Sequence, residues 1–143
     1  MNFLSIFLCL FTAAEYKAYW VLTAKNPPGN KFLTNVGSVA AIFNGMRFIW
    51  SALLDKFPYK VVYGTLLVIE IIIGFTIPFV VDYKWLYAIW VCLAYLCLGG
   101  HFTLVPNELK QLFGPKTTQL YAYMYTYAGI AGVVDSMLCI FTM

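Results

Sequence analysis

Five long apolar stretches, separated by short polar connections, constrain the fold of this chain more than any other feature. They cover about residues 2–22, 32–54, 61–81, 85–105 and 119–141. An α-helix of roughly 20 apolar residues is long enough to cross the hydrocarbon core of a bilayer. Only helices and closed barrels satisfy their backbone hydrogen bonds in lipid, so even the Val- and Ile-rich third stretch predicts a helix. We expect an all-α integral membrane protein with one transmembrane domain of about five helices.

The composition supports the same class and argues against others. Hydrophobic residues make up 62% of the 143 residues and charged residues only 10%, whereas soluble domains carry about 25% charged residues. So little charge cannot cover a water-facing surface. The lysines and arginine are scattered without a basic cluster, so we expect the lipid bilayer, and not a nucleic acid, as a partner.

The first stretch has two interpretations. Its continuous apolar part, residues 3–14, is short and ends in small residues, as a signal peptide does. However, no Lys or Arg precedes it, and Tyr16, Tyr19 and Trp20 prolong it like an aromatic belt at a membrane interface. We favour a retained helix, with a cleaved signal peptide as the alternative.

The cysteines and polar residues give no enzyme signature. All four cysteines lie inside apolar stretches and none forms a C-x-x-C pair, which argues against zinc or redox chemistry; they are Cys9, Cys92, Cys97 and Cys139. The chain shows no nucleophile–base pair, phosphate loop or metal-ligand spacing. We therefore expect no catalytic residues, no cofactor and no metal.

Two opposite charges lie inside predicted helices, where each costs about 2.5–3.5 kcal/mol on insertion scales. At a rise of about 1.5 Å per residue, Arg47 lies about 12 Å along its helix from Asp55, at one end of the turn that joins the two helices. Glu70 lies about 15 Å along the next helix from Lys60, at the other end of that turn. The two helices are antiparallel, so we predict that Arg47 and Glu70 lie at similar depth and pair. This pair either only neutralises the charges or tunes a solute path that Arg47 faces. As a third alternative, the two side chains point apart and Glu70 is protonated.

Other polar residues extend this picture. Asn44 precedes Arg47 by about one helical turn and so shares a similar face. Among the tyrosines of the last stretch, Tyr121 and Tyr125 are four residues apart, and we favour these two as facing a cavity; the alternative is helix packing at an interface. We expect His101 to make a hydrogen bond to a neighbouring helix, and we favour this role over a part in a proton relay.

Three sequence blocks resemble the major facilitator superfamily, in its oxalate/formate-antiporter-like and monocarboxylate-type branch. In the first block, Asn44, Arg47 and Trp50 are similar to an N-G-x-(G)-R-x-x-W run. The loop that follows, with Asp55, Lys56 and Lys60, is similar to the family's D-[RK] loop signature. The second resembles a G-G-x-F…P…L-F-G-x-K run and the third a W-G-x-A-G run; they cover residues 99–116 and 127–132. Together they span nearly the whole chain, in the family's order.

The resemblance implies that the chain corresponds to helices seven to eleven of a twelve-helix carrier, a partial major-facilitator half. Such a carrier moves a small solute, for example an organic anion. Arg47 would face the anion, with Asn44, Tyr121 and Tyr125 also in the solute path. Asp55, Lys56 and Lys60 would form a cytoplasmic gating loop.

The expected function is therefore transport of a small solute, as part or fragment of a carrier completed by a missing amino-terminal half or another membrane protein. Two alternatives remain. The chain is a small non-transporting membrane protein that binds or regulates other helical membrane proteins, or it is a truncated inactive copy. All three place it in a membrane as a multi-pass protein, without naming which membrane.

Overall fold

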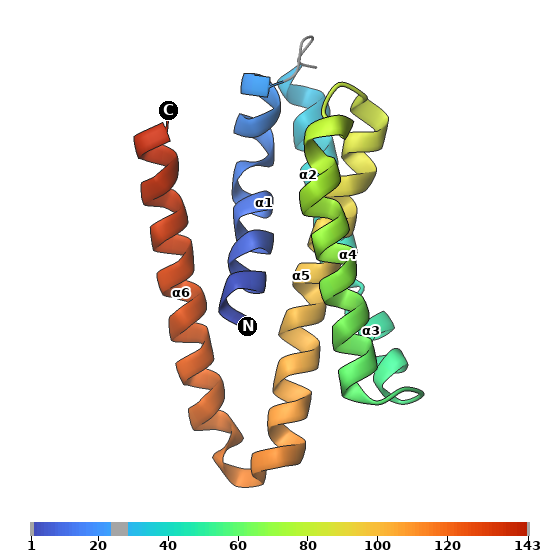
Figure 1. Ribbon diagram of the computed structural model, residues 1–143, viewed down its shortest axis with the longest axis vertical. Coiled ribbons are helices and arrows are strands. Elements are labelled where there is room, and N and C mark those ends of the chain that lie inside the picture. The colour runs from blue at the N-terminus through green and yellow to red at the C-terminus, as the bar shows by residue number, and fades with distance from the viewer. Residues whose placement is uncertain (1, 24–28, 143) are drawn as a thin grey trace.

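The computed structural model is all-α and describes residues 2–23 and 29–142. Side chains at 2–6, 8, 30, 127, 131, 135, 136 and 138–142, Cys139 among them, lie outside the description. The elements are α1 (Asn2–Thr23), α2 (Asn30–Gly45), α3 (Phe48–Leu54), α4 (Tyr59–Val80), α5 (Lys84–Phe113), the 3₁₀ turn η1 (Gly114–Lys116) and α6 (Thr117–Thr142). The chain runs up α1, down α2 and α3, up α4, down α5 and up α6 (Figure 1).

Three of the described stretches are long and apolar enough to cross a membrane, judged by length and composition. They are Lys31–Leu54, Tyr59–Val80 and Lys84–Val134, the last of which contains α5, η1 and most of α6. Helix α1, which carries Glu15 and Lys17 in its second half, is not among them. The all-α class is thus confirmed. Within the described residues, three candidate spans stand where the sequence predicts about five, and they suggest a multi-pass membrane protein.

The second apolar stretch is not one helix, which corrects the expectation for residues 32–54. Helix α2 ends at Gly45, and the amide of Met46 closes it by bonding to the carbonyls of Ile42 and Phe43. A new helix starts at Phe48. Gly45 is a poor helix former, and the carbonyl of Asn44 lies against α5 at Gly99, 2.7 Å from where a Cβ atom would stand. The contact between α2 and α5 therefore favours a break where hydropathy alone indicates a continuous span.

The expected loop over residues 106–116 is also wrong for most of its length. Helix α5 continues through Pro106 to Phe113, although proline cannot donate the bond to the carbonyl four residues earlier. At about 1.5 Å per residue, its 30 residues measure roughly 45 Å, against a hydrocarbon core of about 30 Å. The polar residues therefore lie on the end of α5, which projects beyond the α3–α4 turn (Figure 1). The chain reverses at Gly114, whose φ of 50° suits glycine.

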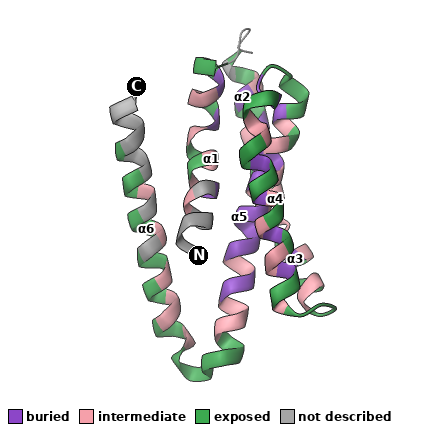
Figure 2. Ribbon diagram, in the orientation of Figure 1, coloured by how far each residue is buried: buried purple, intermediate pink, exposed green. Residues whose placement is uncertain are grey.

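Helix α5 is the central element of the fold, and Figure 2 shows buried residues along most of it. Two apolar clusters pack against it. The first joins the end of α1, the start of α2 and the α4–α5 turn around Trp20, Leu33 and Tyr87. The second joins α3, α4 and the middle of α5 around Trp50, Leu66 and Leu104.

Helix α1 is part of this core. The Tyr87 hydroxyl donates a hydrogen bond to the Tyr16 carbonyl (2.8 Å), and the Tyr95 hydroxyl donates to the Ala13 carbonyl (3.0 Å). Trp20 is only 1% exposed. Removal of α1 would expose these partners, and the retained-helix interpretation of the first stretch stays a prediction.

Two adjacent glycines let α5 approach its neighbours closely. A Cβ atom on Gly100 would collide with the Leu66 side chain of α4 and lie 3.0 Å from the Trp50 ring of α3. The Trp50 ring is fixed there because its Nε1 donates to the Leu96 carbonyl at 2.9 Å. Small residues allow this kind of close helix packing in lipid, and here they bring the middle of α5 between α3 and α4.

Candidate functional site

Three chemically reactive side chains meet in the interior, each from a different helix. Cys9 of α1 donates its thiol hydrogen to Glu70 Oε1 of α4 (3.0 Å). His101 Nε2 of α5 lies 2.5 Å from the same oxygen. The side chain of His101 is 0% exposed and that of Glu70 4%, and Cys9 is 3% exposed. We call Cys9, Glu70 and His101 the buried triad.

The structure corrects the expectation that Arg47 and Glu70 form an ion pair. Among the residues that the structure describes, Glu70 forms its ion pair with His101, and none joins it to Arg47. Equal depth on antiparallel helices does not fix the direction in which two side chains point. Helix α5 lies between them, with Gly99 against Asn44 and Arg47 and with His101 against Glu70. The expectation that His101 makes a hydrogen bond between helices is confirmed.

Arg47 lies at the break between α2 and α3, with an exposed side chain. Its Nε donates to the Asn44 carbonyl at 3.3 Å. Its guanidinium carbon lies 5.5 Å from the centre of the Phe102 ring, within the range of a cation–π contact. Within the described part of the chain, no carboxylate lies within ion-pair distance of Arg47. Among the described residues, the cation is thus held by a carbonyl and an aromatic face.

The aromatic contacts continue from Phe102 to α6. The Phe102 ring stacks on Tyr125, with ring centres 5.5 Å apart. Tyr121 donates its hydroxyl hydrogen to the Tyr125 hydroxyl at 2.5 Å. The structure therefore brings Arg47, Tyr121 and Tyr125 around Phe102, a residue that the sequence did not single out for the site. We call Arg47, Phe102, Tyr121 and Tyr125 the cation–aromatic cluster.

Asn44 borders this cluster from α2. Its side-chain Oδ1 is buried and has no hydrogen-bond partner among the residues that the structure describes. The oxygen lies 3.0 Å from where a Cβ atom on Gly99 would stand, so it points toward α5. A buried acceptor without a partner costs free energy, which makes Asn44 a group that a bound molecule would satisfy.

His101 connects the cation–aromatic cluster with the buried triad. A small cavity of about 20 Å³ between α5 and α6 is lined by His101 and Phe102 on one side and by Tyr121 and Tyr125 on the other. His101 therefore contacts Glu70 on one side of α5 and borders the tyrosines on another. The Tyr63 ring also meets the His101 ring edge-on, with centres 5.7 Å apart.

The residues expected in a gating loop lie away from both groups. Asp55 and Lys56 are exposed in the turn between α3 and α4, and Lys60 is exposed in the first turn of α4. The amide of Asp55 bonds to the Ser51 carbonyl, which continues the end of α3. The turn is present where the sequence places it, and its gating role stays a prediction.

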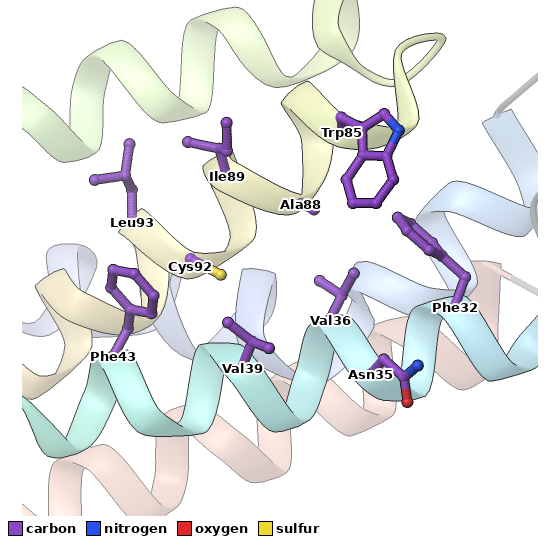
Figure 3. Close-up of a pocket in the computed structure, with 10 residues that line it drawn as sticks. All are labelled: Phe32, Asn35, Val36, Val39, Phe43, Trp85, Ala88, Ile89, Cys92 and Leu93. Atoms are coloured by element: carbon purple, nitrogen blue, oxygen red, sulfur yellow. The ribbon is translucent and has the colours of Figure 1, made fainter.

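A cavity between α2 and α5 has a different character. It measures about 490 Å³. Apolar side chains and Asn35 line it: Phe32, Val36, Val39, Phe43, Trp85, Ala88, Ile89, Cys92 and Leu93 (Figure 3). Its lining offers no charge to an ionic solute, and it suits an acyl chain or the apolar side chains of another helix. We call it the α2–α5 groove.

The sequence reasoning missed the buried triad as a unit. In the sequence, Cys9 shows only an apolar setting without a C-x-x-C pair, and equal depth assigns Glu70 to Arg47. Metal-ligand motifs are recognised from ligands close together in the chain, whereas this triad takes one residue from each of three helices. The only available signal was the rarity of Glu and His inside apolar stretches.

Comparisons of the chain with protein-family models, with curated proteins and with solved structures found no match. The functional argument therefore depends on the geometry of the two groups.

Proposed function

We propose that this chain is part of a membrane carrier for a small organic anion, with Arg47 in the solute path. The observation that carries this proposal is the exposed guanidinium at the break between α2 and α3, which the described residues contact through a carbonyl and an aromatic ring. Arg47 lies within the candidate span Lys31–Leu54 and has an exposed side chain. An arginine at bilayer depth is costly and normally faces a partner charge or a water-filled path. A carboxylate on the solute would supply the missing charge.

The broken helix supports the same function. Interrupted helices are characteristic of solute sites in secondary transporters, because the interruption frees backbone groups near the substrate. Irregular backbone at membrane depth is tolerated where it is packed against protein or lines a cavity. The break at Met46 and Arg47 leaves the Asn44 carbonyl in contact with the arginine and its side-chain oxygen without a partner. Asn44 would then add a hydrogen bond to the solute.

The aromatic residues fit the organic part of such a solute. Phe102 and Tyr125 present stacked rings beside Arg47, and Tyr121 adds a hydroxyl. Ligand sites commonly combine apolar walls with a few polar groups that fix orientation. A small monocarboxylate, with one charge and a short apolar body, is the solute class that this arrangement suits best.

The carrier would need more than this chain. The resemblance of the three sequence blocks to the major facilitator superfamily implies that the chain corresponds to part of the second half of a twelve-helix protein, and such carriers bind solute between two halves. An amino-terminal half or another membrane protein would supply the opposite wall. Asp55, Lys56 and Lys60 would then act in the cytoplasmic loop that changes between access states.

Solute binding by the purified chain in lipid nanodiscs tests the proposal, with formate, oxalate and lactate as probes. We expect Arg47→Ala to weaken binding of the preferred anion about 10- to 100-fold, because a hydrogen bond to a charged group contributes about 1.5–3 kcal/mol. Arg47→Lys should retain part of the affinity. Lys84→Ala is the matched control, because Lys84 is also a cation beside an aromatic ring and is not part of the cation–aromatic cluster. Its ammonium lies 5.9 Å from the Trp85 ring centre. Equal binding by wild type and Arg47→Ala would remove Arg47 from the solute path.

The α2–α5 groove favours a second function, binding to another membrane helix. An apolar surface of this kind marks an interaction site for a partner of similar character. A Val39→Trp change would fill the groove and should reduce association with a designed apolar transmembrane helix in vesicles. If it reduces that association and Arg47→Ala leaves anion binding intact, the helix-binding function replaces the carrier.

A further inference from the structure

We infer that Cys9, Glu70 and His101 form a binding site for one divalent transition-metal ion, with Zn²⁺ as the best-fitting ion. This inference does not depend on the carrier function. The three side chains offer one sulfur, one nitrogen and one carboxylate oxygen, and these atoms lie within 4.8 Å of one another. All three residues are buried.

The present geometry needs only a small adjustment to admit the ion. Zinc bonds of about 2.0–2.3 Å in a tetrahedral site hold neighbouring ligand atoms roughly 3.3–3.8 Å apart. Glu70 Oε1 now lies 3.0 Å from Cys9 Sγ and 2.5 Å from His101 Nε2. The pair with His101 Nε2 must therefore open by roughly 0.8–1.3 Å and the pair with Cys9 Sγ by roughly 0.3–0.8 Å. The sulfur and the nitrogen, which lie within 4.8 Å of each other, must reach the same range. Three ligands leave the fourth position for water.

The chemistry of the ligands selects the class of ion. Calcium and magnesium require mainly oxygen ligands, and the triad supplies only one carboxylate. Thiolate favours zinc and other soft ions, and imidazole suits zinc, copper and nickel. The mixture of sulfur, nitrogen and oxygen therefore points to zinc over a hard cation.

Charge balance supports a divalent ion in this interior. A thiolate and a carboxylate carry two negative charges, and neutral imidazole carries none, so a bound M²⁺ makes the site neutral. A neutral site avoids the large cost of burying net charge in a medium of low dielectric constant. On binding, the Cys9 thiol proton leaves to solvent and its S–H···O bond is replaced by bonds from sulfur and oxygen to the metal. The proton held between His101 Nε2 and Glu70 Oε1 leaves to solvent as well, so that the neutral imidazole, with its hydrogen on Nδ1, binds through the Nε2 lone pair. No atom is oxidised or reduced.

The site would also link three helices that are far apart in the sequence. Cys9 lies on α1, Glu70 on α4 and His101 on α5, so one ion would fix the position of α1 against the other two. Metal binding to the folded state stabilises it by mass action. A rise in the unfolding temperature with Zn²⁺ is therefore a second measure of binding, independent of any transport activity.

The test uses the full chain, purified in detergent, treated with a chelator and then desalted. After incubation with Zn²⁺ and a second desalting, elemental analysis should give one zinc per chain, and Zn²⁺ should raise the thermal midpoint. Co²⁺ in place of Zn²⁺ should give the intense absorption of a cobalt–thiolate bond. Cys9→Ser should abolish that absorption and lower the affinity for Zn²⁺ at least 10-fold, and Glu70→Gln should lower it similarly. Cys92→Ser, which changes a buried cysteine of the other cluster, should behave as wild type.

Cys9→Ser keeps a hydroxyl that can still donate to Glu70, so this variant is expected to fold even where a change of His101 does not. Two results would overturn the site. One is a wild-type chain that binds well below one zinc and shows no thermal shift. The other is an equal zinc content and an unchanged cobalt spectrum in Cys9→Ser.

Discussion

Gly99 is the position where α5 comes closest to the break between α2 and α3, and its replacement tests how that break is held. A Cβ atom there would lie 2.7 Å from the Asn44 carbonyl oxygen, 3.0 Å from Asn44 Oδ1 and 3.4 Å from the Arg47 side chain. The nearest atom belongs to backbone and cannot rotate away. We expect Gly99→Ala to push α5 from α2 and to displace Asn44 and Arg47 together.

The magnitude follows from two opposing terms. Forcing an extra methyl group into a closely packed contact costs about 1–3 kcal/mol. Alanine in place of glycine inside a helix contributes roughly 0.5–1 kcal/mol in the other direction. The net effect at Gly99 is therefore a loss of up to about 2.5 kcal/mol of unfolding free energy. Gly64→Ala in α4 is the matched control, because nothing lies within 4 Å of its added Cβ atom.

Both variants gain the same helix preference, so their difference isolates the packing term of about 1–3 kcal/mol. Unfolding by heat or by a denaturing detergent, followed by circular dichroism, measures it. Anion binding should weaken in Gly99→Ala and not in Gly64→Ala, since only the first change displaces Arg47. Equal unfolding midpoints for the two variants would refute the close approach of α5 to Asn44.

Two further changes test the polar contacts that fix α5. Trp50→Phe removes the hydrogen bond from Nε1 to the Leu96 carbonyl. It should destabilise the fold by about 0.5–1.5 kcal/mol, the net contribution of one hydrogen bond, because the carbonyl keeps its helical donor in α5. A midpoint equal to wild type would show that this bond contributes nothing. Tyr87→Phe removes the bond to the Tyr16 carbonyl and should cost about 0.5–1.5 kcal/mol, measured in the same unfolding assay. Tyr123→Phe on an exposed tyrosine is its control, and an equal loss in both would exclude a specific contact between α1 and α5.

The sequence predicted part of the candidate site. Arg47, Tyr121 and Tyr125 were selected by a charge inside an apolar stretch and by four-residue spacing, and the structure brings them around Phe102. Phe102 itself was not predicted, because one more aromatic residue in a chain with 19% aromatic residues carries no separate signal. The predicted partner of Glu70, Arg47, was wrong, because the helical rise gives the depth of a residue but not the direction of its side chain.

The amino-acid sequence by itself determined the class of the protein. Long apolar stretches with few charges must form helices wherever lipid surrounds them, because no other open structure satisfies the backbone there. The sequence also placed the α3–α4 turn and the α4–α5 turn near their observed positions. These features are local, since they depend on hydropathy, proline and charge within one stretch.

Only the tertiary structure decided where helices break and which polar groups meet. The Asn44 carbonyl beside the break at Met46 and Arg47 packs against Gly99 of another helix, and α5 passes through Pro106 although proline alone indicates an end. Cys9 joins Glu70 across 61 positions of the chain, and His101 joins it across 31. Such contacts depend on how helices rotate about their axes when they pack, and that rotation is set by the shapes of all the facing side chains together.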